Sequence, residues 1–548
     1  MSLSSRIVAM IAKLPKAETR DIVIDRNIKI PMPDGIELSA DHYYPRNNPK
    51  APMLLIRSPY GIGFPFGTTL GVPFAERGFQ VLIQSCRGTF DSGGTFNPHF
   101  DDHADALATV AWIRKQPWFN GELATAGGSY LGFVQWAIAG EDIPEWKAMS
   151  ATLSPQSFCA AAYVGGSFAL DSCLSWAYNV ASQEERTGSV ISAMLSASSD
   201  AKKQQVAFDK LPLIESYKLA TGKPVFFFED WLNHTEPDDK WWEPIDFTPS
   251  ISRINRPVHL MGGWYDFFLT NVMTEYGELV QAGKVPYLTV GPWAHMNMSV
   301  MFVGLREQIA WLQTHVLGKR GLLRDKPVRL FVMGSKQWRD FDEWPPTGYV
   351  PERWYLQGGR GLSSQVPATA KPDYYRYDPA SPTPAIGGTA LTANAGPKDQ
   401  KAVESRSDVL VYTSKPLEKD TEVIGPVQAA LYVKSSLQYT DFFARLCDVD
   451  ASGKSINICD GIMRLKPGKF APEADGAMKI TIDLWPTANL FKRGHRIRLQ
   501  IASGHHPRFA RNTGSGEPLA TASKLVVAKQ EIYHDPAHPS CIILPVKQ

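Results

Sequence analysis

The 548-residue sequence contains no run of about 18 or more apolar residues, so it offers no candidate for a membrane-spanning helix. It has no block of basic residues either, since 57 Lys and Arg are balanced by 55 Asp and Glu and the formal charge is +2. Proteins that bind nucleic acids normally carry a basic patch or stripe. We therefore expect neither a membrane nor a nucleic acid as a partner.

Cysteine is also scarce, with six residues in the whole chain. They are scattered, without a C-x-x-C pair and without a cysteine and histidine cluster at the spacing of metal ligands. This favours reduced cysteines over a disulfide framework and predicts no metal site. The nucleotide-binding signatures G-x-G-x-x-G and G-x-x-x-x-G-K are absent as well. We therefore expect an activity that needs no metal or organic cofactor.

The N-terminal stretch "SSRIVAMIAKLPKAETR" has only a short apolar run, which Lys13 interrupts and Pro15 follows. It has no evident small-residue cleavage site, so we interpret it as a short amphipathic helix rather than a secretion signal. Together with the reduced cysteines, this predicts a cytoplasmic protein.

The first part of the chain alternates between strand-like and helix-like segments. Residues 20–45 alternate apolar and polar side chains around Asp34 and Gly35, which predicts a hairpin with a tight turn. The apolar runs "APMLLIRSPYG" and "GFQVLIQSCRG" are typical of strands buried on both faces. A helical spacing over 100–119 follows, and then the strand and helix of "ELATAGGSYLGFVQWAIAG". The pattern predicts a doubly wound parallel sheet opened by an antiparallel pair.

Two further segments differ from this pattern in composition and periodicity. Residues 156–249 are rich in Ala, Ser and aromatics and predict an inserted helical cap, after which buried-strand patterns resume. Beyond residue 350, short alternating runs separated by turn residues predict an all-β sandwich of jelly-roll type. We therefore expect an α/β domain formed by 1–155 and 250–350, a helical cap formed by 156–249 and a jelly roll formed by 351–548.

One serine, Ser129, stands at a strand-to-helix turn in "LATAGGSYLGFVQW". Such a glycine-rich turn can cradle a phosphate, pack a helix closely on a sheet, or hold a nucleophile on a strained corner. A serine acts as a nucleophile when a base and a residue that orients the base lie within reach. In α/β-hydrolases these follow in the order Ser, Asp or Glu, His, each at the end of a strand. Asp266 follows the strand of "GGWYDFF" and His295 follows that of "GPWAH", so the required order is present.

An acyl-transfer site also needs hydrogen-bond donors for the oxyanion. The backbone N–H of Tyr130, directly after the nucleophile, is one candidate, and Tyr60 in "LLIRSPYG", after an earlier strand, is another. Alone, Asp266 could cap a helix and His295 could be a packed core histidine. The three residue types at three strand ends in the required order favour catalysis by Ser129, Asp266 and His295.

Seven stretches resemble, in order, the signatures of the CocE/NonD hydrolases, which include cocaine esterase, α-amino acid ester hydrolases and X-Pro dipeptidyl-peptidases. The stretches are "RSPYG", "QSCRGTFDSGG", "KQPWFNGELATAGGSYLGFVQW", "GGWYDFF", "VGPWAH", "RLFVMGSKQWRDFDEWPP" and "GHRIRLQIASGHHPRFARNTGSG". The resemblance runs from about residue 20 to the C-terminus and implies an α/β-hydrolase with an inserted helical cap and a C-terminal jelly roll. It also implies Ser129 as the nucleophile and Tyr60 as an oxyanion donor. Asp266 and His295 match the acid and the base of the family.

Three positions depart from the common patterns. Ser85 stands where the family often carries an aspartate, and Gly94 stands where a glutamate is usual. The closing glycine of the turn, Gly132, comes three residues after the serine rather than two as in G-x-S-x-G. None is a triad position, and we expect Gly132 to allow close packing of the helix on a strand.

The predicted substrate pocket rests on aromatic residues. Phe267 and Phe268 beside Asp266, with Phe168 and Trp176 of the cap, predict a pocket lined by aromatic side chains, although core packing explains any single cap aromatic more simply. The favoured function is a serine hydrolase of esters or amides of small, partly aromatic acyl groups. The enzyme would act on a small molecule, and the β domain offers surfaces through which a homo-oligomer could form.

Other functions remain open at this point. An X-Pro dipeptidyl-peptidase or α-amino acid ester hydrolase must pair the ammonium group of its substrate with buried carboxylates, because an unpaired buried charge is costly. Asp171, Glu184, Glu185 and Glu229 are the candidates, but nothing in their spacing requires them to converge on Ser129, and a solvated helix face explains them more simply. A further alternative is a non-catalytic carbohydrate-binding protein in which the jelly roll carries the function.

Overall fold

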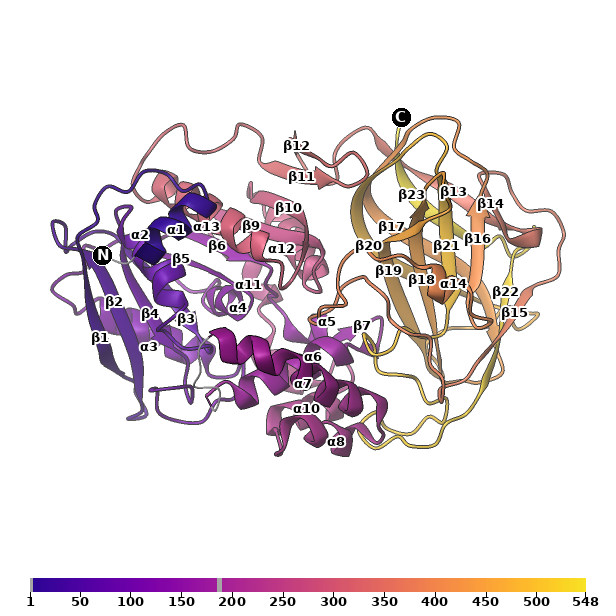
Figure 1. Ribbon diagram of the computed structural model, residues 1–548, viewed down its shortest axis with the longest axis horizontal. Helices are drawn as coiled ribbons and strands as arrows, with labels where there is room; N and C mark the ends of the chain where they lie inside the picture. The colour runs from indigo at the N-terminus through magenta and orange to yellow at the C-terminus, as the bar shows by residue number, and fades with distance from the viewer. Residues whose placement is uncertain (1–2, 185–189) are drawn as a thin grey trace.

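A ten-stranded sheet forms the centre of the α/β domain in the computed structural model, which describes residues 3–184 and 190–548 (Figure 1). The strand order is β1-β2-β4-β3-β5-β6-β9-β10-β11-β12. The strands are β1 (Ile22–Pro31), β2 (Glu37–Pro45), β3 (Met53–Ser58), β4 (Gln80–Ser85), β5 (Leu123–Gly128), β6 (Trp146–Thr152), β9 (Val258–Tyr265), β10 (Tyr287–Ala294), β11 (Val328–Val332) and β12 (Gln337–Phe341). Neighbours from β4 to β11 are parallel, whereas β1–β2, β2–β4 and β11–β12 are antiparallel. The predicted parallel sheet with an antiparallel opening is confirmed.

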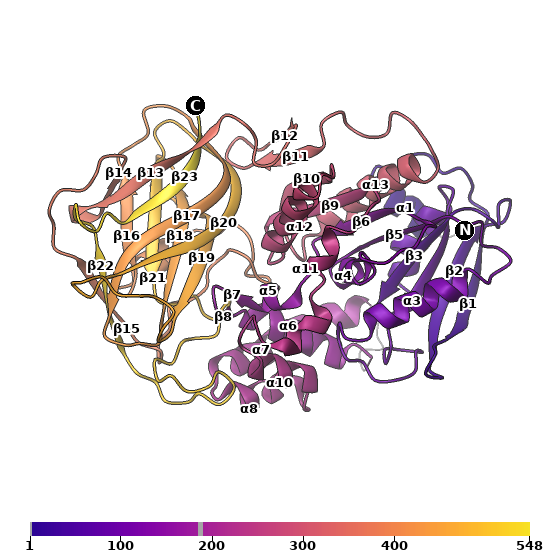
Figure 2. The ribbon, with the colours of Figure 1, turned by 180° about the vertical axis from the view of Figure 1, so that it is seen from behind.

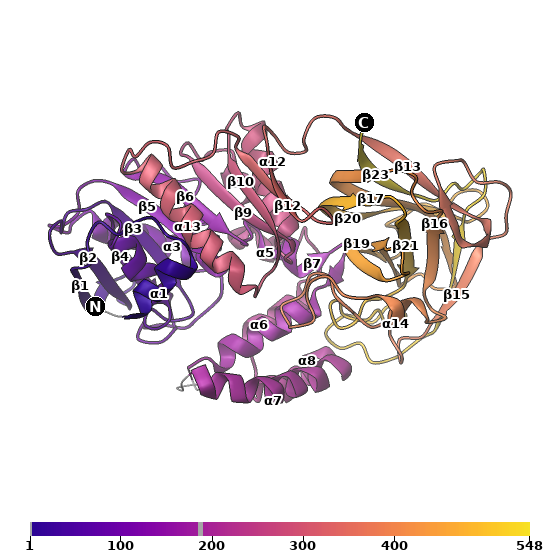
Figure 3. The same ribbon diagram turned by 45° about the horizontal axis from the view of Figure 1, so that its top comes forward.

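Side chains along each central strand alternate between the two faces of the sheet, and the central strands carry apolar side chains on both. Helices therefore cover both faces. In β3, Leu54 and Ile56 pack in one apolar cluster, and Met53 and Leu55 pack in another. Figure 3 shows α1 and α13 over one face, and Figure 2 shows α3 in front of the other. The helices of this domain are α1 (Leu3–Ile11), α2 (Val72–Ala75), α3 (Asp102–Ile113), α4 (Tyr130–Trp136), α12 (Leu269–Gln281) and α13 (Met298–His315). No helix in the described part of the chain is long and apolar enough to cross a membrane.

The cap interrupts the sheet domain between β6 and β9. It is mainly helical, as predicted, with one short hairpin, and α6 and α7 run side by side below the two larger parts of the molecule (Figure 3). Its elements are α5 (Phe158–Ala162), β7 (Tyr163–Val164), β8 (Ser167–Phe168), α6 (Leu170–Ser182), α7 (Val190–Asp209), α8 (Leu213–Ser216), α9 (Lys218–Thr221), α10 (Phe226–Asn233), η2 (Lys240–Ile245) and α11 (Thr248–Ile251).

An antiparallel β domain follows the α/β domain and lies beside both it and the cap (Figure 1). The strand order is β15-β22-β17-β23-β13-β14-β16-β21-β18-β19, β20 pairs with β17, and β14 and β16 form a parallel pair. The strands are β13 (Tyr349–Gln357), β14 (Gly361–Ser363), β15 (Asp373–Tyr377), β16 (Leu410–Ser414), β17 (Thr421–Ser435), β18 (Thr440–Val449), β19 (Ser455–Leu465), β20 (Met478–Phe491), β21 (Arg496–Ala502), β22 (Ala528–Tyr533) and β23 (Cys541–Lys547). A helix, α14 (Lys401–Glu404), lies between β15 and β16 in sequence. The fold class predicted from the sequence is thereby confirmed in all three parts.

Candidate active site

Three side chains meet at the carboxyl edge of the parallel sheet. Ser129 directly follows β5, Asp266 follows β9 and His295 follows β10. Because β5, β6, β9 and β10 are parallel neighbours, their carboxyl ends lie along the same edge. The sheet therefore brings together a serine and a histidine that are 166 residues apart in the sequence.

These side chains form a chain of hydrogen bonds. Nε2 of His295 lies 3.0 Å from Oγ of Ser129, and Nδ1 of His295 lies 2.7 Å from Oδ2 of Asp266. The backbone N–H of Phe268 donates to Oδ1 of Asp266 at 2.8 Å, and this carboxylate is completely buried. A buried carboxylate on Nδ1 holds the proton there, which leaves Nε2 free to accept the serine proton.

The backbone at Ser129 is strained. Its φ of 57° and ψ of −127° lie in a region that L-residues rarely adopt, at a cost of about 1–3 kcal/mol. The turn is compact because two glycines allow close approaches: a Cβ on Gly127 would lie 2.4 Å from Cβ of Leu131, and one on Gly132 would lie 2.3 Å from Cβ of Ser154. Gly132 thus packs α4 against the segment after β6, which explains why the closing glycine comes one residue late.

Tyr60 follows β3 and points its phenol toward the same edge. Nε1 of Trp176 donates a hydrogen bond to the Tyr60 hydroxyl at 2.9 Å, so the hydroxyl keeps its own proton for donation. Burial raises the pKa of Tyr60 and outweighs the opposing hydrogen bonds from Trp176 and Ser129. The phenol is therefore protonated and can serve as a donor beside the serine.

The side chain of Tyr130 has a different partner. Its hydroxyl donates to Oδ2 of Asp102 at 2.6 Å and accepts from the backbone N–H of His99 at 2.8 Å. The backbone N–H of Tyr130 stands at the first position of α4, where no carbonyl within the helix can accept it. Its phenol is thus fixed to the first residue of α3 and to the loop before it, and its amide is the group available to an oxyanion.

A pocket of about 40 Å³ lies beside Ser129, with room for a few waters. Its lining is mostly apolar and aromatic. The lining residues are Tyr60, His99, Ser129, Tyr130, Phe133, Pro155, Phe158, Ala161, Ser172, Cys173, Trp176, Phe267 and Phe268. Among these described residues none is an aspartate, glutamate, lysine or arginine.

The predicted pocket aromatics fall into two groups. Phe267, Phe268 and Trp176 line the pocket, and the Phe267 ring lies 4.5 Å from the ring of His295. Phe168 does not line it, which corrects the prediction. The Phe168 side chain is completely buried and packs against Tyr163 and Phe228, because β8 directs it into the interior of the cap.

Several lining residues of the cap were not predicted from the sequence. Ser172 and Cys173 lie one helical turn before Trp176 on α6, and Phe158 and Ala161 lie on α5. Ser172 and Cys173 could have been found from their spacing, because residues four and three positions before Trp176 share a helix face with it. For α5 the sequence held no comparable signal, because the segment is too short for a period.

His99 is the least expected residue of the lining. Its ring stacks on Tyr130 at 4.8 Å between centroids and contacts Phe133 at 4.2 Å and Phe158 at 4.8 Å. Burial lowers the pKa of His99 to about 3, so its imidazole is neutral. Neither ring nitrogen has a hydrogen-bond partner among the described residues. The pocket therefore stays uncharged even where it contains a histidine.

The carboxylates considered for an ammonium group are occupied elsewhere. Asp171 accepts hydrogen bonds from Leu391 and Thr392 of the β domain, the first at 2.8 Å. Glu184 accepts the backbone N–H of Phe90. Glu229 accepts a hydrogen bond from the hydroxyl of Tyr217. Glu185 lies outside the described residues.

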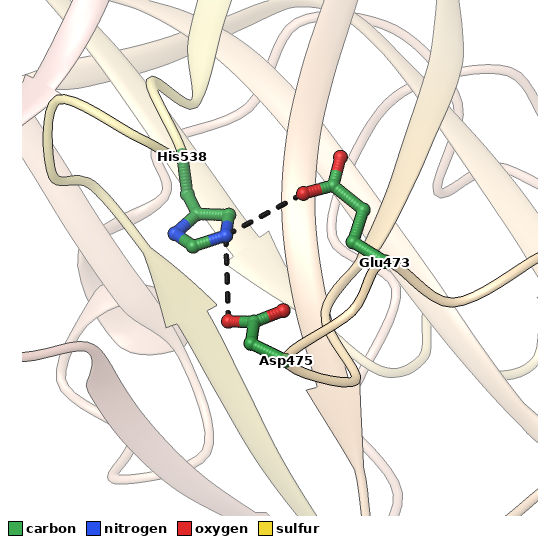
Figure 4. Close-up of side chains that lie close together, drawn as sticks. All are labelled: Glu473, Asp475 and His538. Atoms are coloured by element: carbon green, nitrogen blue, oxygen red, sulfur yellow. Dashed lines mark ion pairs between the residues drawn. The ribbon is translucent and has the colours of Figure 1, made fainter.

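A different group of side chains lies together in the β domain. Nε2 of His538 is 3.5 Å from Glu473 and 3.4 Å from Asp475 (Figure 4). Its Nδ1 is 3.2 Å from Asp535. In the described part of the chain, Glu473, Asp475 and His538 have potential metal-ligand atoms within 4.8 Å of one another, a grouping that the sequence spacing did not suggest. Glu473 and Asp475 are exposed, and Lys434 also pairs with Asp475 at 3.7 Å. These ion pairs account for the grouping, and we assign no ion to it.

Comparisons with known proteins agree with this architecture. Residues 34–297 match the family described as X-Pro dipeptidyl-peptidase (S15 family), and residues 321–543 match the X-Pro dipeptidyl-peptidase C-terminal non-catalytic domain. Cocaine esterase of Rhodococcus sp. (strain MB1 Bresler) is 32% identical over 95% of this chain and 98% of its own length.

Two solved structures share the fold along nearly the whole chain. An aminopeptidase from the marine sediment archaeon Thaumarchaeota archaeon superposes with a TM-score of 0.82 at 22% identity, covering 97% of this chain and 98% of that one. An α-amino acid ester hydrolase superposes with a TM-score of 0.79 at 20% identity, with the same coverage of 97% and 98%. At these sequence identities the two structures show a shared fold and nothing about the activity of this chain.

Proposed function

Because the chain belongs to the X-Pro dipeptidyl-peptidase (S15) family of CocE/NonD hydrolases, it is a serine hydrolase that acts on esters or amides, and we propose that its substrates are esters of small, uncharged, partly aromatic acids. We assign Ser129 as the nucleophile, His295 as the general base and Asp266 as the residue that orients it. The relative with 32% identity is named as an esterase, which supports an ester rather than a peptide.

In the first step, Nε2 of His295 takes the proton of Ser129 while Oγ forms a bond to the carbonyl carbon. The electron pair of the carbonyl moves to its oxygen, and the Tyr60 hydroxyl and the Tyr130 amide donate hydrogen bonds to this oxyanion. When the carbonyl forms again, the bond to the leaving alkoxide breaks and the alkoxide takes the proton from His295. The product of this step is an acyl group on Ser129.

In the second step, water replaces the serine as nucleophile. His295 accepts a proton from the water while the oxygen attacks the acyl carbon, and the collapsing intermediate returns the proton to Oγ of Ser129. Asp266 keeps the imidazole in one tautomer and stabilises its positive charge in both steps. The carboxylic acid is then released.

The uncharged lining of the pocket carries the choice of substrate. The described lining holds no carboxylate or cation, and its histidine is neutral because burial lowers the pKa of His99 to about 3. A charged acyl group would lose its hydration there without gaining a partner, which costs several kcal/mol. A neutral acyl group with an aromatic or small aliphatic part suits this lining best.

The family description supports a second candidate, an X-Pro dipeptidyl-peptidase. That activity needs anionic partners for the N-terminal ammonium group of the peptide. Asp171, Glu184 and Glu229 are engaged with other groups, and none of them lines the pocket. We therefore rank the esterase first.

The test of this ranking compares p-nitrophenyl acetate and p-nitrophenyl benzoate with Ala-Pro-p-nitroanilide. We expect a larger kcat/KM for the two esters. A larger kcat/KM for the anilide would reverse the ranking while leaving the nucleophile unchanged.

The test of the nucleophile is labelling with a fluorophosphonate. We expect the wild type to be labelled once per chain and Ser129→Ala to remain unlabelled, with Ser154→Ala as the control serine that keeps the label. Equal labelling of wild type and Ser129→Ala would overturn the assignment of Ser129.

A further inference from the structure

A second and larger cavity lies between the cap and the β domain. Its volume is about 710 Å³, within the range of sites that bind small molecules. The cap contributes Tyr163, Leu170 and Phe208, and the β domain contributes Tyr439 and Leu519. It shares no lining residue with the pocket beside Ser129.

The charged residues around this cavity are not balanced. Among its basic residues, Arg464 pairs with Asp441 at 2.8 Å and Lys466 pairs with Glu236. Within the described parts of the chain, Lys469 and Arg511 have no carboxylate at ion-pair distance, although both line the cavity. Two basic side chains are thus left without an acidic partner.

The contacts of these two residues orient them without neutralising them. Arg511 donates to the backbone carbonyls of Asp209 at 2.8 Å and Pro379 at 3.2 Å, and Lys469 donates to the carbonyl of Arg464 at 3.1 Å. Burial lowers the pKa of Arg511, which means that the surroundings do not fully compensate its charge.

The other acidic residue of the lining besides Glu236, Glu517, is already engaged. The Glu517 carboxylate accepts the backbone N–H groups of Ser523 at 3.0 Å and Lys524 at 2.9 Å, and the hydroxyl of Ser515 at 3.0 Å. These bonds keep Glu517 within its own loop and away from Lys469 and Arg511. The cations therefore remain available to an external anion.

We propose that this cavity is a second binding site, which takes a small organic carboxylate with an apolar, preferably aromatic, body. Arg511 and Lys469 bind the carboxylate, and the apolar wall of Tyr163, Leu170 and Phe208 contacts the body of the ligand. A guanidinium is well suited to this task because its fork of N–H groups matches the two oxygens of a carboxylate.

Part of the cavity comes from a sequence signature that the catalytic centre does not use. The C-terminal stretch "GHHPRFARNTGSG" contributes His506, Arg511, Asn512, Thr513 and Gly516 to the lining. The site is also adjacent to the catalytic pocket through the cap: Leu170 at the start of α6 faces the cavity, and Trp176 one to two turns later faces the pocket.

The test is calorimetric titration of the full-length enzyme with 3-phenylpropionate, with its neutral analogue 3-phenylpropanamide and with inorganic phosphate. We expect the carboxylate to bind and the amide to bind at least about tenfold more weakly, since a hydrogen bond to a charged group is worth about that factor. Equal binding of the amide would overturn the proposed role of charge, and stronger binding of phosphate would overturn the proposed organic ligand.

Variants then locate the site. We expect Arg511→Gln and Lys469→Gln each to weaken 3-phenylpropionate binding about tenfold, and Arg511→Lys to retain part of it. Arg376→Gln, which removes an exposed arginine paired with Asp378 outside the cavity, is the matched control. Unchanged affinity in Lys469→Gln and Arg511→Gln would mean that the carboxylate binds elsewhere, including beside Ser129, and would refute the proposal.

Melting temperatures separate a binding effect from unfolding. Arg511 bridges two carbonyl groups, so Arg511→Gln can lose stability, whereas the Lys469 side chain is exposed and its replacement leaves the packing intact. If Arg511→Gln fails to fold, the Lys469→Gln result decides. None of these measurements depends on hydrolysis, so this proposal and the proposed esterase activity can fail independently.

Discussion

The pocket beside Ser129 and the cavity between the cap and the β domain are built on the same cap helix but differ in charge. The pocket is small, aromatic and uncharged, whereas the cavity is larger and holds two cations without acidic partners. Among the described lining residues of the pocket none is a carboxylate, lysine or arginine, so the proposed triad is the main electrostatic feature that this lining presents to a substrate. The sheet thus positions the proposed catalytic residues, and we expect the charges of the surrounding parts to determine which ligands each space accepts.

The largest expected effect is a loss of turnover in the pocket with unchanged ligand binding in the cavity. Asp266→Asn replaces the carboxylate that fixes the tautomer of His295 by a neutral amide whose NH2 group can donate to Nδ1, so we expect kcat for p-nitrophenyl acetate to fall by about 10⁴-fold. Binding of 3-phenylpropionate to the cavity should be unchanged in calorimetry. A decrease below about tenfold in kcat would contradict the role of Asp266.

The next effect tests the oxyanion donor. Tyr60→Phe removes one hydroxyl, and we expect kcat to fall about 10²- to 10³-fold while KM changes little, since the donor acts mainly on the transition state. Steady-state kinetics provide the measurement, and Tyr44→Phe, on β2 and away from the site, is the control. A rise in KM at constant kcat would show that Tyr60 stabilises the bound substrate and the transition state equally.

A smaller effect would make the pocket resemble the cavity by adding a charge. Ser172→Asp places a carboxylate in the lining, and we expect the ratio of kcat/KM for an α-amino ester over the matching neutral ester to rise about tenfold. Ser172→Asn has nearly the same shape without the charge and should leave the ratio as in the wild type. The same ratio in both variants would show that charge in the pocket does not control the choice of substrate.

The last effect is on stability rather than on turnover, and it concerns the neutral histidine of the pocket. The pKa of His99 is lowered to about 3 in the folded protein, against 6.5 in an unfolded chain, so the unfolded state takes up a proton that the folded state excludes. Below pH 6.5 the wild type therefore loses about 1.4 kcal/mol of stability per pH unit from this residue, until the pH approaches 3. His99→Phe should abolish this loss.

Melting curves between pH 7 and pH 4.5 measure this loss of stability. The melting temperature of His99→Phe should rise relative to that of the wild type as the pH falls. His103→Gln, on the exposed side of α3, is the control and should follow the wild type. Parallel pH profiles of wild type and His99→Phe would show that His99 is protonated in the folded protein.

Local patterns were sufficient to predict the fold and the arrangement at the strand ends. Apolar runs identify buried strands, and residues directly after parallel strands necessarily meet at one edge, which is why Ser129, Asp266 and His295 could be chosen from order alone. The position of Gly132 was also interpretable, because a glycine in a helix start indicates a close approach.

The lining of the two spaces could not be predicted in the same way. Phe168 and Trp176 are both cap aromatics, yet one packs in the interior and the other lines the pocket, because the direction of a side chain in the cap depends on tertiary packing. His99 precedes the nucleophile in a loop, where no periodic pattern applies. The unpaired cations Lys469 and Arg511 lie 42 residues apart in a domain whose sequence shows only alternating strands, and ion pairing depends on contacts across domains.

The strained backbone of Ser129 has a consequence for how this protein can change. The fold holds a non-glycine residue at a φ of 57°, which a glycine would adopt without strain. Replacement of the proposed nucleophile by glycine would therefore relax the backbone, so selection for thermal stability alone would favour loss of activity at this position. Such a trade-off means that a library screened only for heat resistance will accumulate inactive proteins, and both properties must be selected together.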